Sequence, residues 1–338
     1  MGVIQHEIAH ALGLIHTHQR ADAGQHLRFV EGNLVFNGVC TSNYLLAGRA
    51  FATQAVNSHL SPFPYDFGSV MHYPAVPRHR RCRNGQPGNT TVYVARTALH
   101  QQTMGQRFAL SFLDFAMINH QYCPHSCAGV PSKTDLDKQN DNNVEQPKNR
   151  KLSPTATTPK SQQQPTANLP VHDCLRGGYP NPANCSVCLC PDGFGGAKCE
   201  RLTERRSALC GGWFNISDEQ SLAENRTHSF GVPDFPDPQD EAGDLNCVWM
   251  ISAPVGRKVH LKIAQPFQLL PPTLGSCRDE FVEIKTGPDF RPTGYRFCGL
   301  TPPNGPLIST ESELLVMLQP RTCEFSPPVF AFNVWIAP

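Results

Sequence analysis

The chain has 338 residues, a length that suggests two or three domains, and its 29 Lys and Arg nearly balance its 28 Asp and Glu for a formal net charge of +1. The balanced charge argues against a nucleic acid partner, and no stretch approaches the roughly 20 apolar residues of a membrane-spanning helix. Fourteen cysteines indicate an oxidising compartment, so we expect a secreted protein.

The first sixteen residues contain the pattern of a catalytic zinc site. On a helix, His6 and His10 lie four residues apart on the same face, so both imidazoles can reach one metal ion. Glu7 lies beside them, where a carboxylate can accept a proton from water on the metal. Gly13 lets the helix end and the chain turn, which brings in His16 as a third ligand. Three protein ligands and one open position are typical of a catalytic zinc, whereas two surface histidines on an amphipathic helix are the alternative.

This pattern extends into the signature of metzincin peptidases, H-E-x-x-H-x-x-G-x-x-H. The residues His16-Thr17-His18-Gln19-Arg20-Ala21-Asp22 resemble the continuation of that signature in the astacin family of zinc endopeptidases. Further segments resemble, in order, elements of the same family: Tyr65–Tyr73 its Met-turn, and 105–107, 110–114 and 122–123 its closing helix. The resemblance covers residues 1–127 and implies an α+β metzincin fold.

The resemblance also implies roles for individual residues. One zinc ion per chain would be bound by His6, His10 and His16. Glu7 would be the general base, and Tyr73 a switchable ligand that then stabilises the oxyanion. Met71 would form an apolar floor beneath the metal, with an ordinary buried methionine as the alternative. The remaining histidines, such as His18 and His72, do not continue the spacing and are expected on the surface or beside the site.

Two features depart from the family pattern. Thr17 stands where the family carries a glutamate that receives the new N-terminus after propeptide removal. The chain also begins five residues before His6, without the signal peptide, propeptide and mostly β N-terminal half of the family. We therefore expect an N-terminally truncated chain in which Met1 is an internal start.

Residues 128–173 differ in composition from the segment before them. The run 131–170 is rich in Pro, Thr, Ser, Gln, Asn and Lys and nearly lacks aromatic residues. Such a segment cannot bury enough apolar surface to offset chain entropy, so we predict a disordered linker. A plain spacer is the simplest interpretation, and an O-glycosylated stalk and a retained intron are the alternatives.

Residues 174–200 contain five cysteines, glycine turns and few apolar residues, which is typical of a small module held by disulfides. The spacing C-x-x-C-x-C-P-x-G-F-G-G-x-x-C resembles an EGF-like module, in which Cys127 would supply the missing first cysteine. The resemblance implies the pairs Cys127–Cys185, Cys174–Cys188 and Cys190–Cys199. The alternative is half of a zinc site at Cys185 and Cys188, but no second pair follows at metal-site spacing.

Residues 210–338 contain short apolar or alternating runs between Pro, Gly and Asn clusters, a pattern that predicts an all-β sandwich. The motifs Cys210-Gly-Gly, Cys247-x-Trp249 and Phe297-Cys298-Gly299 resemble, in order, those of a CUB domain. The resemblance implies the disulfides Cys210–Cys247 and Cys277–Cys298. Calcium can bind loop carboxylates of such domains, and here Glu280 stands at the usual aspartate position beside Asp279. An exposed acidic loop is the alternative.

Four cysteines remain: Cys40, Cys82, Cys123 and Cys323. Cys40 and Cys82 can pair with each other within the catalytic segment. The family partner of Cys123 lies in the N-terminal half, and Cys323 has no assigned partner.

The order of protease, linker, EGF-like and CUB-like segments is similar to that of nematode astacins. We therefore predict a secreted, multidomain zinc metalloendopeptidase that cleaves protein or peptide substrates of the extracellular matrix or cuticle. Glycosylation is predicted at Asn89, Asn215 and Asn225. The alternative is a non-catalytic secreted protein whose EGF and CUB modules bind a partner while the protease segment is inert.

Overall fold

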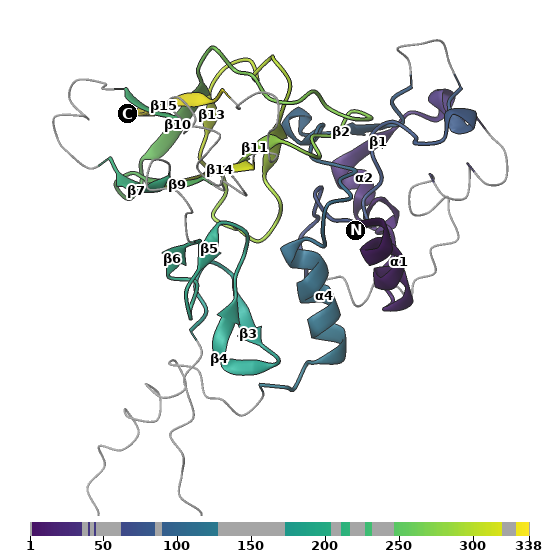
Figure 1. The fold of residues 1–338 in the computed structure, drawn as a ribbon, viewed down its shortest axis with the longest axis horizontal. Helices are drawn as coiled ribbons and strands as arrows, with labels where there is room; N and C mark the ends of the chain where they lie inside the picture. The colour runs from purple at the N-terminus through teal and green to yellow at the C-terminus, as the bar shows by residue number, and fades with distance from the viewer. Residues whose placement is uncertain are drawn as a thin grey trace, which may run out of the picture.

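The computed structural model arranges the chain as three modules that contact one another (Figure 1). The described residues are 2–35, 40, 44, 62–84, 90–127, 173–203, 211–216, 227–231, 247–319 and 329–337. We call 2–127, which the sequence predicts to be a protease, the catalytic segment, 173–203 the EGF-like module and 211–337 the CUB-like domain. The predicted linker, apart from its last residue, lies outside the described residues.

The catalytic segment begins with helix α1, Gly2–Ala11, which ends two residues before the turn at Gly13. The chain continues through η1 (Thr17–Gln19), α2 (Ala23–His26), β1 (Leu27–Phe29), η2 (Glu31–Asn33), η4 (Arg80–Cys82), β2 (Tyr93–Ala95), η5 (Ala98–His100) and α4 (Phe112–Tyr122). Strands β1 and β2 pair antiparallel.

Two apolar clusters hold the catalytic segment together. The larger one surrounds Tyr93 and includes Leu27 and Phe67, and the disulfide Cys40–Cys82 joins two of its members. The smaller one packs α1 against the predicted Met-turn; its buried members are Ala9, Leu14, Val70 and Met71.

Helix α4 begins at a capping box. Ser111 Oγ accepts a hydrogen bond from Asp114 N (3.2 Å), and the Asp114 carboxylate accepts one from Ser111 N (3.0 Å). These bonds satisfy amide donors that the first turn of a helix leaves without partners. Helix α4 also contacts Tyr179: Phe112 packs against its ring, and Asn119 Nδ2 donates to its hydroxyl at 2.9 Å. Because Tyr179 belongs to the EGF-like module, α4 is also a contact between modules.

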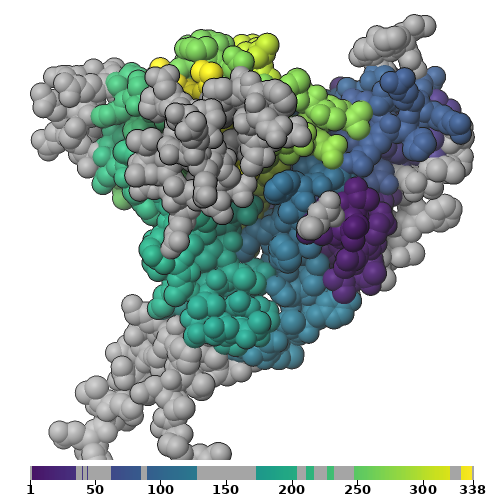
Figure 2. Space-filling model, in the orientation of Figure 1, coloured from purple at the N-terminus to yellow at the C-terminus, as the bar shows by residue number. Residues whose placement is uncertain are grey.

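The EGF-like module consists of two short hairpins held by disulfides. Its strands are β3 (Tyr179–Asn181), β4 (Asn184–Leu189), β5 (Phe194–Gly195) and β6 (Arg201–Leu202). The bridges are Cys127–Cys185, Cys174–Cys188 and Cys190–Cys199. Figure 2 shows this module (teal) lying against α4 (blue) and the sandwich (green).

The CUB-like domain is a sandwich of two sheets, with strand orders β13-β10-β15-β8 and β12-β11-β14-β9-β7. The strands are β7 (Gly212–Asn215), β8 (His228–Gly231), β9 (Cys247–Ser252), β10 (Lys258–Ile263), β11 (Phe281–Lys285), β12 (Tyr295–Phe297), β13 (Leu307–Ile308), β14 (Glu313–Gln319) and β15 (Ala331–Ala337). Trp249 lies in the core between the sheets, against Phe330 and Phe332.

Strand β9 is buried on both faces, which explains its unbroken apolar sequence. Trp249 and Ile251 face the core of the sandwich, whereas Val248 and Met250 pack against Phe194 of the EGF-like module. The second sheet is therefore covered on its outer side by another module instead of by water.

The expected fold class is confirmed: an α+β catalytic segment, a disulfide-rich small module and an all-β sandwich. The structure contains the bridge Cys277–Cys298, and Cys247 is also disulfide-bonded. Cys123 forms no disulfide. Four sites of the sequence analysis lie outside the described residues: Cys210, Cys323, Asn89 and Asn225. Within the described ranges, no helix is long and apolar enough to cross a membrane.

Candidate metal centre

Three histidines converge at the end of α1. His6 and His10 project from the same helical face, and their ligand atoms and that of His16 all lie within 4.8 Å of one another. The His16 Nε2 atom lies 3.1 Å from His10 Nε2 and 3.3 Å from His6 Nε2. Gly13 makes the turn between helix and third histidine at φ +92°, a conformation that costs glycine little.

Each imidazole is oriented by an oxygen that contacts its other nitrogen. The oxygen partners of the Nδ1 atoms are Val70 O for His6 (2.8 Å), Leu14 O for His10 (2.8 Å) and Gln19 Oε1 for His16 (3.1 Å). A carbonyl oxygen can only accept, so each Nδ1 carries the proton and each neutral ring turns a bare Nε2 lone pair inward. Three lone pairs facing one another repel, and a cation between them removes the repulsion.

The spacing of these nitrogens fits zinc. Zinc–nitrogen bonds of about 2.0–2.1 Å in tetrahedral geometry place two ligand nitrogens about 3.3–3.4 Å apart. The two recorded separations, 3.1 Å and 3.3 Å, are close to this value. The residues present therefore fit a zinc ion held by three neutral imidazoles.

Burial keeps two of these imidazoles, those of His6 and His16, in the form that binds metal. Burial, and then the neighbouring His10 and His6, lower the pKa of His16 to about 3. The pKa of His6 is also lowered, chiefly by burial. Both rings are consequently neutral at physiological pH, so no proton competes with a metal for their Nε2 atoms.

Met71 belongs to the apolar cluster beside α1. The residue is only 1% exposed and packs with Ala9, which precedes His10 on α1, and with Leu14, which follows the turn at Gly13. The Met71 carbonyl accepts a hydrogen bond from Thr17 N at 3.2 Å, one residue after the third histidine. Met71 is therefore a buried apolar residue next to the segments that carry His10 and His16, and its role as a floor beneath a metal stays a prediction.

Tyr73 and Glu7 flank the three histidines. The Tyr73 ring centroid lies 4.3 Å from that of His16, and the Arg107 guanidinium lies 6.0 Å from the Tyr73 ring. Burial raises the pKa of the Tyr73 phenol, against the opposing effect of Arg107, and the charge of Glu7 contributes to the rise. The Tyr73 phenol therefore stays protonated at physiological pH. Glu7 is exposed at the surface of α1.

Asp114 is a buried residue to which the sequence analysis assigned no role. Its carboxylate accepts hydrogen bonds from Ser69 Oγ (2.6 Å), Val70 N (2.9 Å) and Ser111 N (3.0 Å). Burial raises the pKa of this carboxyl to about 6. The local signal was the capping box with Ser111, but nothing in the sequence indicated that the same carboxylate holds the Met-turn.

Of the two positions expected for His72, on the surface or beside the site, the structure has the second. His72 is fully buried, where its Nε2 accepts a hydrogen bond from the Tyr65 hydroxyl (2.8 Å) and its Nδ1 donates to Tyr73 O (2.7 Å). Burial lowers its pKa to about 4. His18 is likewise fully buried, with its ring 4.6 Å from that of Tyr73.

The two residues considered as calcium ligands, Asp279 and Glu280, differ from each other in burial. Asp279 is exposed, whereas Glu280 is buried and its carboxylate accepts a hydrogen bond from Leu270 N. Among the described residues, the three histidines of the catalytic segment form the one group of three or more metal-binding side chains.

Comparisons with known proteins bear on both ends of the chain. Residues 1–123 match the family model of the astacin peptidases, and residues 218–323 match that of the CUB domain. Zinc metalloproteinase nas-36 of Caenorhabditis briggsae is 34% identical over 319 residues, which cover 94% of this chain and 41% of that protein. Zinc metalloproteinase nas-26 of Caenorhabditis elegans is 30% identical over 328 residues, 96% of this chain and 62% of that protein.

A solved structure of the CUB1-EGF-CUB2 domain of human MASP-1/3 is similar to 48% of this chain and 54% of that chain, at 19% identity and a TM-score of 0.31. The chain spans about two fifths of the length of the nas-36 proteins that it matches. The matched segment 1–123 contains all three converging histidines, and the family that it matches implies a catalytic zinc. Residues 1–123 are therefore similar to the astacin peptidases, and in this chain they are joined to a segment that matches the CUB domain.

Proposed function

We propose that this chain carries the catalytic centre of a secreted zinc endopeptidase that hydrolyses internal peptide bonds of extracellular proteins. The observation that carries the proposal is the convergence of three Nε2 lone pairs on one point, beside a carboxylate and a protonated phenol. When bound, zinc supplies Lewis acidity, which polarises a peptide carbonyl and makes water acidic enough to attack near neutral pH.

Glu7 would move the proton in this reaction. Its exposed carboxylate adjoins His6 on α1, so it can accept the proton of the attacking water as the new carbon–oxygen bond forms. The same carboxyl then returns that proton to the leaving amine as the carbon–nitrogen bond breaks. No covalent bond to the protein is required.

Tyr73 would stabilise the negative charge that develops on the carbonyl oxygen. Its phenol is held protonated by burial, so it is available as a hydrogen-bond donor. Arg107 supports the turn in which Tyr73 lies, because its guanidinium donates to His72 O at 2.9 Å. A positive charge near the ring also favours the developing anion.

The remaining parts of the proposal concern organisation and surroundings. We assign a catalytic domain to 1–127, a linker to 128–173, an EGF-like module to 174–200 and a CUB-like domain to 210–338. Disulfides in all three modules support an extracellular location, since such bonds persist in oxidising compartments. The two relatives described above are Caenorhabditis proteins, which supports matrix or cuticle proteins as the substrates.

Replacing Glu7 tests the function. For the full chain, Glu7→Gln is expected to lower kcat for casein or gelatin cleavage about 10²–10⁴-fold, the range of general acid–base catalysis, while one zinc per chain remains bound. The matched control is Glu311→Gln, an exposed glutamate of the CUB-like domain, which keeps full activity.

Two results would count against the proposal. Cleavage that is equally fast in the Glu7 variant would remove Glu7 as the base. A chain that binds no zinc and cleaves nothing would favour a non-catalytic protein whose EGF-like and CUB-like modules bind a partner.

A further inference from the structure

The CUB-like domain contacts the catalytic segment at the Met-turn itself. Asp66 Oδ1 accepts a hydrogen bond from Thr293 N at 3.1 Å and a second from Gly68 N at 3.0 Å. Asp66 and Thr293 are 2% and 3% exposed, so this contact excludes water. One carboxylate thus holds a turn of the catalytic segment and a loop of the CUB-like domain together.

The fit between the two surfaces is close at Gly68. A Cβ atom built on Gly68 would lie 2.2–2.4 Å from three atoms of the Thr293 side chain, well inside van der Waals contact. The contact therefore requires glycine at this position because of space, independently of backbone conformation.

A second set of hydrogen bonds holds the same loop a short distance away. Thr103 Oγ1 donates to Gly294 O and accepts from Arg296 N, both at 3.1 Å. Outside this loop, Cys277 N of the CUB-like domain donates to Gln102 O of the catalytic segment at 2.8 Å. Most of these partners are backbone atoms, so the loop is held in a defined position.

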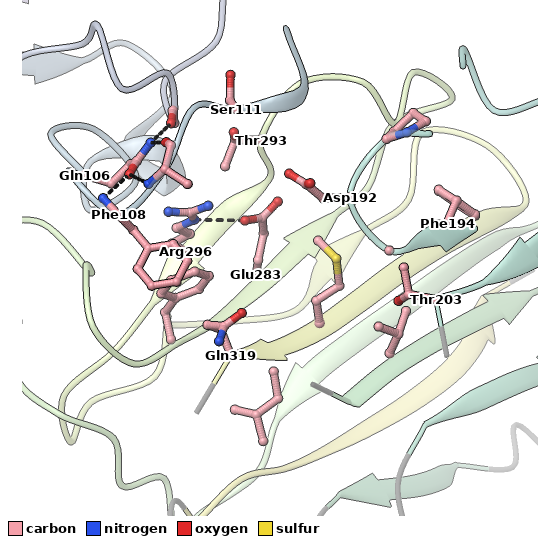
Figure 3. Close-up of a pocket in the computed structure, with 18 of the residues that line it drawn as sticks. Gln106, Phe108, Ser111, Asp192, Phe194, Thr203, Glu283, Thr293, Arg296 and Gln319 are labelled. Carbon is pink, nitrogen blue, oxygen red and sulfur yellow. Dashed lines mark hydrogen bonds and ion pairs between the residues drawn. The ribbon is translucent and has the colours of Figure 1, made fainter. Parts of the chain in front are cut away.

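Within the CUB-like domain, Glu283 supports this loop. Figure 3 shows its carboxylate facing Arg296 at the edge of a cavity of about 400 Å³ between the three modules. Glu283 accepts from Gly294 N and from Arg296 Nε, both at 2.8 Å, and is 2% exposed. The segment 293–296, which leads into β12 and which we call the docking loop, is therefore held by β11 as well as by the Met-turn.

The turn that this loop contacts also orients the first histidine. Two residues after Gly68, Val70 O accepts the hydrogen bond of His6 Nδ1 at 2.8 Å. Gly68 O is itself held by Gln106 Nε2 at 2.7 Å. A short hydrogen-bonded segment thus connects Thr293 with the three histidines.

We propose that the CUB-like domain is a positioning element of the metal centre, with Thr293 as the contact residue. By docking on Asp66 and Gly68 it holds the Met-turn so that Val70 O fixes the tautomer and direction of His6. The proposal rests on the proposed function for the identity of the metal. Thr293 touches neither substrate nor metal, and it acts through the turn.

The test enlarges Gly68 and then restores the space. In the full chain, Gly68→Ala is expected to raise the zinc Kd, measured by chelator competition, about 10–100-fold, the usual effect of losing a hydrogen-bond partner of a metal ligand. It should also speed hydrogen exchange of the amides of 66–72 and lower kcat with little change in KM. Adding Thr293→Gly removes the clashing atoms and should restore zinc affinity in the double variant.

Gly24→Ala is the matched control, because a Cβ built there meets nothing within 4 Å, and it should leave all three readouts unchanged. If Gly68→Ala fails to fold, Thr103→Val removes two hydrogen bonds of the same contact without a clash and should raise the zinc Kd to a smaller extent. Faster exchange of 293–296 with unchanged zinc Kd and unchanged exchange of 69–71 would overturn the proposal. Hydrogen exchange of the Met-turn amides is also measured without zinc. A wild-type chain that binds no zinc would refute the proposed function, while these exchange rates would still show whether the CUB-like domain holds the Met-turn.

Discussion

Each histidine of the metal centre depends on a single oxygen for its orientation. For His10 and His16 that oxygen lies within four residues, so the turn after α1 supplies it locally. For His6 the acceptor is Val70, 64 residues further along the chain. The first ligand is consequently the one whose geometry depends on packing between distant segments.

Buried histidines also make the folded state sensitive to acid. His72 has a folded-state pKa of about 4, below its ordinary value of 6.5, so below pH 6.5 the unfolded chain binds a proton that the folded chain excludes. The contribution of neutral His72 to the free energy of unfolding should therefore be complete above pH 6.5. It should fall by about 3 kcal/mol as the pH drops toward 4.

Denaturant titrations of the zinc-free chain across this range measure the effect. His72→Gln should flatten the slope of unfolding free energy against pH, even though it also removes the hydrogen bond from Tyr65. The exposed His125→Gln is the control and should keep the wild-type slope. An unchanged slope in the His72 variant would show that other groups cause the acid sensitivity.

At the scale of elements, α1 and α4 are connected through the Met-turn between them. Helix α1 contributes Ala9 and two of the histidines, and α4 contributes the capping carboxylate of Asp114. Figure 1 shows the two helices side by side. The Met-turn therefore lies between one helix that carries ligands and another that anchors it.

Removing the Asp114 carboxylate should loosen this arrangement. Asp114→Ala leaves the donors Ser69 Oγ, Val70 N and Ser111 N buried without an acceptor, and each unsatisfied group costs about 1–3 kcal/mol. We expect a loss of several kcal/mol in the free energy of unfolding, measured by denaturant titration. Asp114→Asn retains one acceptor oxygen and should lose less; equal stability of the two variants would contradict this account.

At the scale of the whole molecule, each of the three modules contacts the other two. The catalytic segment meets the CUB-like domain at Thr293 and the EGF-like module at Tyr179. The EGF-like module in turn packs on the outer face of the second sheet, where Arg176 pairs with Glu313 and lies 5.1 Å from the Trp213 ring. Each module thus buries part of the surface of its neighbours.

The disulfide Cys127–Cys185 should stabilise this arrangement most. It closes a loop with a sequence separation of 58 residues, for which the chain-entropy model gives about 4 kcal/mol. Replacing both cysteines by alanine should lower the free energy of unfolding by about that amount, measured with denaturant. The same double replacement at Cys190 and Cys199, whose separation is 9, should cost less; the reverse order would show that strain or contacts outweigh loop length.

Much of the metal site was determined by the sequence alone, because its geometry is local. The spacing of His6, His10 and His16 and the turn at Gly13 follow from helical periodicity and from the dihedral freedom of glycine. The bridges within the EGF-like and CUB-like modules followed from resemblance. Only the tertiary structure decided that Val70 orients His6, that Asp114 holds the Met-turn and that Thr293 docks on Gly68. These partners lie far apart along the chain, and no short-range pattern encodes which packed surfaces meet.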